Sequence, residues 1–313
     1  MEKKDKKALG RNIGWMFMKF SVAFSGMLSL KANYFIGYLL GSLAYFTIIP
    51  QRRIGIEGLT IAFPKKSLRE KKKIVRDFFI FMVQCSFELL HYLRHRDKLD
   101  SVRVEGKKHL EEALEKKKGV IIVTAHLGSF PLLSLKLAKL GFKVNFITRP
   151  MRDKRAGDYL YKIRSDAGVK TIYSYPRREC VNGIIKALRY NEAVILQMDQ
   201  NFGTGGVWVN FFGKLAATPV GPISLALRTK AAIIPAYIYR EDNRKHCIKI
   251  FSQHQLIITD DKDKTILENA IALTRIIQKW VSKYPEQWGW IHRRWKSRPS
   301  AKIKTMRFKI EEQ

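Results

Sequence analysis

The sequence is short of cysteine and of acidic residues, and each shortage excludes a class of protein. Three cysteines occur in 313 residues, far apart and without CxxC or Cys/His spacing, at Cys85, Cys180 and Cys247. This argues against a disulfide framework or a zinc site and favours reduced thiols in a reducing, cytosol-facing compartment. Asp and Glu number 27 against 59 Lys and Arg, which gives a net charge of +32. Such a basic chain suits anionic partners: nucleic acid, anionic membranes, phosphorylated substrates or an acidic carrier protein.

Features of several other protein classes are also missing. The chain has no Walker phosphate-binding pattern, no internal repeat and no long low-complexity linker. No small-residue cleavage site follows the basic N-terminus, so we expect that segment to be retained. Apolar residues make up 46% of the chain, enough for a substantial core. We predict a basic N-terminus with a membrane-anchoring helix over 1–51, a basic helical segment over 52–100 and one domain over 101–313.

One stretch near the N-terminus is a candidate membrane helix. Residues 32–51, "ANYFIGYLLGSLAYFTIIPQ", carry no charge between Lys31 and Arg52, and a spanning helix needs about 20 such residues. A buried core helix is the alternative, because Asn33 and Pro50 shorten the apolar stretch and two glycines weaken it. Basic residues at both ends leave open whether the helix crosses the membrane or lies in the cytoplasmic leaflet. In both cases we expect membrane attachment through the first 50 residues.

Apolar strand-like runs alternate with helical stretches after residue 101. This alternation implies crossover connections and a largely parallel central sheet with helices on both faces, which is an α/β fold. In the segment before it, Ser67 and Glu70 have the spacing of a capping box and predict the start of a helix. The five predicted strands are Gly119–Thr124, Val144–Thr148, Thr171–Tyr175, Ala193–Met198 and Ala232–Tyr239.

His126, Arg149 and Asp199 each lie at the carboxyl end of a predicted strand, the edge at which parallel sheets bind ligands. Gly128 permits a tight turn after His126, and Pro131 suits the first turn of a following helix. We expect the positive end of that helix to disfavour a second proton on His126, and its free N–H groups to hold an oxyanion. A neutral histidine here can act as a general base, although a lone histidine in such a turn is often structural.

The most distinctive stretches are "MDQNFGTGGVWVNFFGKLAATPVGPISLALRTKAAIIPAYIYR" (198–240) and "PEQWGWIHRRWKSRP" (285–299). With "LTIAFPKKSLREKKK" (59–73), they resemble the late acyltransferases of lipid A biosynthesis, part of the wider lysophospholipid acyltransferase group. The resemblance implies transfer of a fatty acyl chain from an acyl carrier protein thioester to a hydroxyl of a lipid A precursor. It places the enzyme at the cytoplasmic face of the inner (plasma) membrane, with an acyltransferase domain over 101–313. It implies no metal and no cofactor, because the thioester is already activated.

The signature of this family is a histidine followed five positions later by an acidic residue. His126 is present, but Pro131 occupies the acidic position, and proline cannot orient an imidazole. Asp199 is the best replacement, because it closes another strand of the predicted sheet and related enzymes carry an acid on this strand. Alternatively, Asp199 is a cap or turn residue of the glycine-rich loop that follows it.

Arginines near the predicted sheet edge are candidate ligands for anionic substrate groups, because guanidinium groups bind phosphates in a bidentate manner. The resemblance places a substrate arginine at Arg149, and Arg164 is a second candidate. Arg152 and Arg155 are equally well explained as a solvated helix face.

Other candidate substrate contacts lie in two loops. We expect Gly128 and Ser129 to bind substrate through the turn after His126, and Asn201 either to contact a carbonyl or phosphate or to satisfy its own turn. Residues 288–299, "WGWIHRRWKSRP", interleave tryptophans with basic residues. This pattern suits a membrane headgroup contact better than nucleic acid, which we do not expect as a partner. We interpret His292 as a packing residue.

Alternatives remain for donor, acceptor and activity. Coenzyme A is an alternative to the acyl carrier protein as acyl donor, and a lysophospholipid, glycolipid or lipoamino acid is an alternative anionic lipid acceptor. Loss of the acidic signature residue also permits a non-catalytic, lipid-binding pseudoenzyme.

Overall fold

A seven-stranded sheet forms the centre of the computed structural model, which describes residues 3–242 and 244–299. Its strand order is β1-β9-β8-β2-β5-β3-β4, and all neighbours are parallel except β8 and β9. The strands are β1 (Arg103–Glu105), β2 (Val120–Thr124), β3 (Val144–Thr148), β4 (Val169–Tyr173), β5 (Ala193–Gln197), β8 (Ala232–Arg240) and β9 (His246–Ile250). A separate antiparallel hairpin joins β6 (Val207–Phe211) to β7 (Lys214–Thr218).

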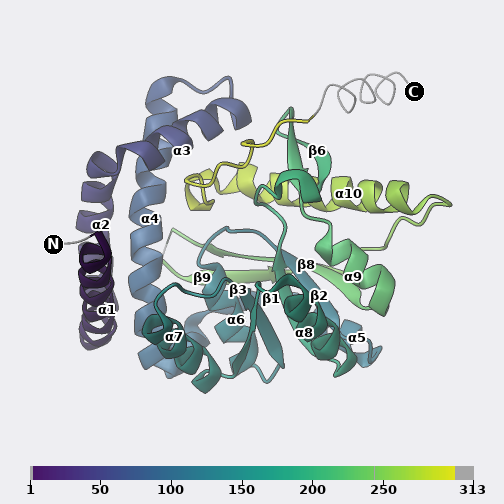
Figure 1. The fold of residues 1–313 in the computed structure, drawn as a ribbon, viewed down its shortest axis with the longest axis horizontal. Coiled ribbons are helices and arrows are strands. Elements are labelled where there is room, and N and C mark those ends of the chain that lie inside the picture. The colour runs from purple at the N-terminus through teal and green to yellow at the C-terminus, as the bar shows by residue number, and fades with distance from the viewer. Residues whose placement is uncertain (1–2, 243, 300–313) are drawn as a thin grey trace.

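Helices cover both faces of the sheet, which confirms the predicted α/β architecture (Figure 1). Along β2, Val120 and Ile122 belong to one buried cluster and Ile121 and Val123 to the other, because successive strand side chains point to opposite faces. The first cluster includes residues of α5 (Lys107–Glu115) and α6 (Phe130–Lys139). The second includes residues of α8 (Arg177–Arg189), α9 (Gly221–Thr229) and α10 (Lys262–Lys283). The remaining helix of this region, α7 (Lys154–Asp166), lies beside β4.

All five predicted strands are present, with ends shifted by at most two residues. The β6–β7 hairpin was not predicted. Its two turn residues, Phe212 and Gly213, both have positive φ, a turn usually signalled by Asn-Gly rather than Phe-Gly. β1 and β9 were also missed, because a three-residue edge strand and a basic five-residue strand carry little periodic signal.

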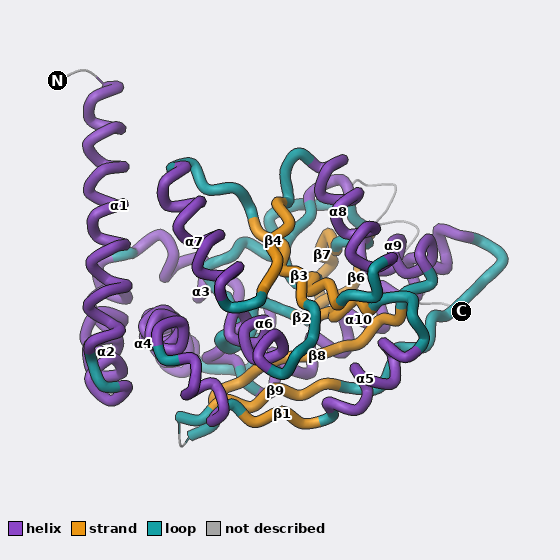
Figure 2. Tube along the Cα trace, turned by 90° about the horizontal axis from the view of Figure 1, so that it is seen from below, coloured by secondary structure: helices purple, strands orange, loops and turns teal. Residues whose placement is uncertain are grey.

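Four helices precede the sheet: α1 (Lys3–Met27), α2 (Leu30–Thr47), α3 (Ile49–Ala62) and α4 (Leu68–Arg94). The capping box is confirmed, since the Ser67 side chain accepts the Glu70 N–H and the Glu70 carboxylate accepts the Ser67 N–H. In two perpendicular views, α1 and α2 lie on the outer side of α4, away from the sheet (Figures 1 and 2). The predicted boundaries at residues 51 and 100 remain predictions, and residues 300–313 of the proposed third part lie outside the described chain.

The predicted continuous membrane helix over 32–51 is wrong. The chain turns by 87° between α2 and α3, and Pro50 lies in the first turn of α3. In the described part of the chain no single helix has the length and hydropathy to cross a membrane, and only this bent pair meets both requirements when taken together. A Cβ on Gly41 would come within 2.5 Å of Ile80 Cα, and one on Gly37 would meet Gln84. The two glycines therefore allow α2 to pack closely on α4.

Candidate active site

His126 and Asp199 meet at the carboxyl edge of the sheet. Thr124 on β2 pairs with Gln197 on β5, and each functional residue lies two positions beyond its member of that pair. Parallel neighbours about 4.8 Å apart bring residues at the same level into contact. His126 Nδ1 lies 2.8 Å from Asp199 Oδ1. The strand register thus joins the two side chains that the sequence suggested as partners.

Asp199 is buried, and both of its carboxylate oxygens accept hydrogen bonds. Its Oδ2 accepts the backbone N–H of His126 and the indole N–H of Trp288, both at 2.8 Å, which leaves Oδ1 for the imidazole. Burial raises the pKa of the carboxyl, but the charge of His126 and the hydrogen bonds outweigh burial and lower the pKa to about 2. Asp199 therefore remains charged at neutral pH.

The pKa of His126 lies above its ordinary value of 6.5. Burial lowers this pKa, but the charge of Asp199 and its hydrogen bond raise it by more. The expectation that the helix end would disfavour a second proton is wrong for the net pKa of His126, because the Asp199 carboxylate is in direct contact with the ring. In the neutral form, Nδ1–H donates to Asp199 and the lone pair of Nε2 is left on the opposite side of the ring.

The turn after His126 depends on glycine. Gly128 has φ +63°, and a Cβ there would lie 2.0 Å from the carbonyl oxygen of Ile238, so no other residue fits. The N–H of Gly128 donates to the carbonyl of Gln287 at 2.9 Å and is not available to substrate. α6 then begins at Phe130 with Pro131 in its first turn, and the N–H groups of Ser129 and Phe130 at this helix start are candidate donors to a ligand.

Ser129 faces the pocket rather than capping α6. The residue is 1% exposed, and its hydroxyl has no hydrogen-bond partner of normal geometry among the described residues. It lies close to the Cys85 thiol, whose pKa is raised by burial. A buried hydroxyl in this state is a polar group available to a bound ligand.

The C-terminal loop holds the histidine turn in place, a role that the sequence did not suggest. Gly289 N–H donates to the carbonyl of His126 at 3.0 Å, next to the Trp288 contact with Asp199. The Gln287 carboxamide in turn accepts from the N–H and donates to the carbonyl of Arg240, both at 2.8 Å. The loop therefore joins the turn to β8 through these hydrogen bonds.

The tryptophans and cations of residues 288–299 do not share one exposed face, because some are buried while Arg293, Lys296 and Arg298 are exposed. Trp288, Trp290 and Arg294 are each 1% exposed, so the prediction of a headgroup contact by these side chains is wrong. The Arg294 guanidinium donates to the Ala217 carbonyl and to the Thr218 hydroxyl, and burial lowers its pKa to about 10. The stretch packs against the site as a structural loop.

His292 and Asn201 lie beside the pair. Asn201 N–H donates to His292 Nε2 at 3.2 Å, and its carboxamide donates to Ser297. Burial lowers the pKa of His292 to about 4, so this ring is neutral. Asn201 Oδ1 is buried without a hydrogen-bond partner in the described chain, and it remains a candidate polar contact.

None of the candidate arginines lines the pocket beside His126. Arg149 is exposed just after β3, and no ion pair involves it among the described residues. Arg164 lies on α7, where its Nε donates to the Thr171 hydroxyl at 3.0 Å and burial lowers its pKa. Arg155 pairs with Asp153 and Arg152 is solvent-exposed, which fits the solvated-face interpretation.

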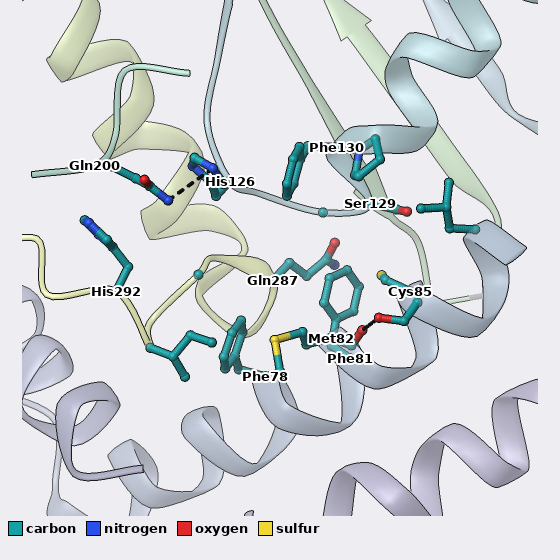
Figure 3. Close-up of a pocket in the computed structure, with 16 residues that line it drawn as sticks. Phe78, Phe81, Met82, Cys85, His126, Ser129, Phe130, Gln200, Gln287 and His292 are labelled. Carbon is teal, nitrogen blue, oxygen red and sulfur yellow. Dashed lines mark hydrogen bonds between the residues drawn. The ribbon is translucent and has the colours of Figure 1, made fainter. Parts of the chain in front are cut away.

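A pocket of about 360 Å³ opens beside His126 (Figure 3). His126, Gln200 and His292 lie on one side of it in this view, and Cys85 and Ser129 lie on the other. One wall comes from α4 and is mostly apolar; it consists of Phe78, Phe81, Met82, Cys85, Ser86 and Leu89. The volume of the pocket is at the lower end of the range for small-molecule sites. Within the described chain, no group of three His, Cys, Asp or Glu side chains could hold a metal ion.

Comparison with known proteins shows the family to which the chain belongs. The family described as bacterial lipid A biosynthesis acyltransferase matches residues 2–297. The chain is 27% identical over 279 residues to the lipid A biosynthesis lauroyltransferase of Escherichia coli (strain K12), across 85% of this chain and 86% of that protein. It is 25% identical over 275 residues to the lipid A biosynthesis palmitoleoyltransferase of the same strain, across 85% of each.

Relatives with another named acceptor also match. The chain is 24% identical over 198 residues to the phosphatidylinositol mannoside acyltransferase of Mycobacterium tuberculosis (strain CDC 1551 / Oshkosh), across 63% of this chain and 60% of that protein. All these relatives are named as acyltransferases, and the family match extends over nearly the whole chain. The protein therefore belongs to the bacterial lipid A biosynthesis acyltransferase family and is an acyltransferase.

Proposed function

We propose that the protein transfers a fatty acyl chain from an acyl carrier protein thioester to a hydroxyl of a lipid A precursor, with His126 as general base. The observation that carries this proposal is the hydrogen-bonded His126–Asp199 pair at the mouth of a mostly apolar pocket. A charged, buried carboxylate behind a histidine suits proton transfer, and an apolar wall suits an acyl chain.

The reaction follows from the hydrogen-bond directions. His126 Nε2 takes the proton of the acceptor hydroxyl as its oxygen attacks the thioester carbon, and Asp199 stabilises the imidazolium that forms. The free N–H groups of Ser129 and Phe130 are the candidate donors to the oxyanion. The carbon–sulfur bond then breaks, and the imidazolium returns the proton to the departing sulfur. The products are the ester and the free carrier thiol.

The acyl chain is expected to lie along α4. With the thioester carbonyl beside His126, the acyl chain would follow the pocket towards Met82 and Cys85 (Figure 3). These side chains bury methylene groups, each worth about 0.8 kcal/mol on transfer from water. The far side of the pocket then limits the length of the chain.

Charge complementarity supports an acidic carrier and an anionic acceptor. The chain carries a net charge of +32, and Arg149, Arg152 and Arg177 are exposed near the carboxyl ends of β3 and β4. We assign substrate phosphate binding to Arg149. An acidic carrier protein approaches such a surface by electrostatic steering, so the initial rate should fall as salt rises.

Attachment to the cytoplasmic face of the inner membrane is supported by α1 and α2. Both helices expose apolar side chains three or four residues apart, which places them along one face of each helix. They are Ile13, Met16, Phe20, Phe24 and Met27 on α1, and Phe35, Leu39, Leu43 and Phe46 on α2. Exposed apolar faces flanked by basic residues favour helices that lie in the headgroup region.

Acylation of another lipid is a second candidate. The match to phosphatidylinositol mannoside acyltransferases is the observation that favours it, because those relatives have a different named acceptor. The same base, oxyanion donors and apolar pocket would serve either acceptor, since the attacking group is a hydroxyl in both.

The test is a transfer assay with purified protein and acyl carrier protein or coenzyme A thioesters. Acceptors are a lipid A precursor, a phosphatidylinositol mannoside and a lysophospholipid, and products are identified by mass spectrometry. We expect transfer to the lipid A precursor, its loss in His126→Ala, and an unchanged rate in the control His109→Ala on α5. Transfer that survives His126→Ala would contradict the general-base role, and no transfer to any acceptor would indicate a pseudoenzyme.

A further inference from the structure

The nitrogen of His126 that must receive the acceptor's proton is already occupied. The carboxamide Nε2 of Gln200 lies 3.1 Å from His126 Nε2, on the side of the ring opposite Asp199 (Figure 3). An acceptor hydroxyl needs this same position, because a base must be within hydrogen-bond distance of the proton that it removes. Gln200 and the acceptor therefore compete for one lone pair.

The direction of this hydrogen bond follows from the pair behind it. Asp199 is charged and accepts from Nδ1, so in the neutral imidazole Nδ1 carries the proton and Nε2 is an acceptor. The Gln200 amide must then donate its N–H to Nε2. A donated hydrogen bond stabilises the neutral ring, the form that a general base needs.

Only the side chain of Gln200 is free to move. Its carbonyl accepts a hydrogen bond from Arg294 at 3.3 Å, and the next N–H, that of Asn201, donates to His292. The side chain is exposed, and within the described part of the chain its carboxamide makes no other hydrogen bond. A rotation about the side-chain bonds can therefore release His126 without moving the loop.

We propose that Gln200 caps His126 Nε2 in the free enzyme, is displaced by the acceptor hydroxyl, and then donates its amide N–H to the thioester oxyanion. This inference rests on the proposed acyl transfer. The attacking oxygen, hydrogen-bonded to Nε2, must be about 3 Å from the thioester carbon, so the carbonyl oxygen lies within reach of the displaced amide. Gln200 would thus supplement the Ser129 and Phe130 donors.

The proton and electron balance is that of the proposed reaction. The hydroxyl proton passes to Nε2 as the carbon–oxygen bond forms, and the carbonyl electron pair moves onto the oxygen that Gln200 contacts. When that pair returns, the carbon–sulfur bond breaks and Nε2 gives the proton to sulfur. Gln200 neither gains nor loses a proton.

The cap also bears on the competing reaction with water. His126 is only partly buried, so without Gln200 a water molecule could occupy Nε2 and attack a bound thioester. The Gln200 amide competes with that water whenever no acceptor is bound. An enzyme with the cap should therefore retain its acyl donor until the lipid arrives.

The decisive variant is Gln200→Leu, which removes the amide and leaves an apolar side chain one atom shorter, with the exposed Gln255→Leu as matched control. Loss of one oxyanion donor should lower the single-turnover transfer rate by about 10²–10³-fold. The rate of thiol release from the donor in the absence of acceptor measures hydrolysis. The ratio of this rate to the transfer rate should be higher in Gln200→Leu than in the wild type. Gln200→Asn, a shorter amide, should recover part of the transfer rate. Wild-type transfer and hydrolysis in Gln200→Leu would overturn the inference.

A second measurement does not depend on turnover. NMR titration of His126 in the free protein should show a higher pKa in Gln200→Leu than in the wild type, because the donor that stabilises the neutral ring is gone. An unchanged pKa would refute the cap even if the protein proved inactive with every acceptor. Failure of the wild-type transfer assay together with a raised pKa would instead count against the proposed function alone.

Discussion

Replacing Asp199 by asparagine tests the chemistry of the site with almost no change in shape. The Asn oxygen can accept the His126 and Trp288 N–H groups at the position of Oδ2, which directs the amide nitrogen towards His126 Nδ1. Nδ1 must then accept rather than donate, so the ring proton moves to Nε2. A histidine protonated at Nε2 cannot take a proton from the acceptor hydroxyl.

The expected loss is large. In a hydrolase triad, the same exchange of tautomer costs about 10⁴-fold in kcat, which corresponds to about 5 kcal/mol of transition-state stabilisation. We expect Asp199→Asn to lower transfer by two to four orders of magnitude. Removal of the carboxylate charge also removes the cause that raises the pKa of His126. The residual activity should therefore rise with pH around a lower pKa than in the wild type, in which the pKa of His126 lies above 6.5.

Stability changes in a known direction. The Asp199 pKa of about 2 lies below its ordinary value of 3.8, so the charged group adds stability above about pH 4 that is lost as pH falls towards 2. A shift of nearly two pKa units corresponds to about 2 kcal/mol. Asp199→Asn should lose this contribution at pH 7 and show a weaker acid dependence of Tm between pH 4 and 2.

The assay is the initial transfer rate from pH 5 to 9, with Tm measured on the same samples. The exposed Asp260→Asn is the matched control and should retain the wild-type rate and profile. A rate within threefold of wild type, or an acid limb at the wild-type pKa, would refute the assignment of Asp199 as the partner of His126.

Three further changes test the surroundings of the pair. Trp288→Phe removes one N–H donor to Asp199, so kcat should fall about 10–100-fold with KM unchanged, consistent with the loss of a hydrogen bond to a charged group. Trp208→Phe is the control, and equal kcat values in the two variants would contradict a role of Trp288 in catalysis. Cys85→Trp fills the far side of the pocket, so the ratio of rates with short and long acyl donors should rise, and an unchanged ratio would place the chain elsewhere. Phe20→Glu with Phe35→Glu should weaken sedimentation with anionic vesicles at least tenfold; wild-type binding would exclude that face as the membrane contact.

Much of the fold could be predicted from local patterns. The five predicted strands are short and mostly apolar, with many β-branched residues, and Ser67 with Glu70 specifies a helix start by direct hydrogen bonds. The bend between α2 and α3 could not be read from hydropathy, because Gly37 and Gly41 weaken an isolated helix but allow close packing on α4. The conformation of this segment depends on its packing against α4, and the local sequence gives no information about that contact.

The candidate site was also predictable only in part from the sequence. His126 and Asp199 could be placed together because strand ends of a parallel sheet share an edge, an argument that needs only the strand assignment. Trp288 reaches Asp199 through a loop contact 89 residues away, and no periodicity predicts that pairing. The residues after Trp288 resemble a membrane-binding surface in the sequence, because tryptophans alternate with basic residues. Arg294 is instead buried, and its partners lie on the β6–β7 hairpin, which the sequence did not predict.

The acid on β5 makes the base depend on the whole domain rather than on one turn. A partner at position 131 would belong to the same strand-to-helix segment as His126, and the pair would be largely local. Here the acid comes from β5, its second oxygen is held by Trp288 of the C-terminal loop, and the imidazole is capped by Gln200. Position 131 is thereby free to carry a proline, which lies in the first turn of α6 and lines the pocket. The histidine is oriented only when β2, β5 and the C-terminal loop have all assembled, so correct protonation of the base is itself a consequence of folding.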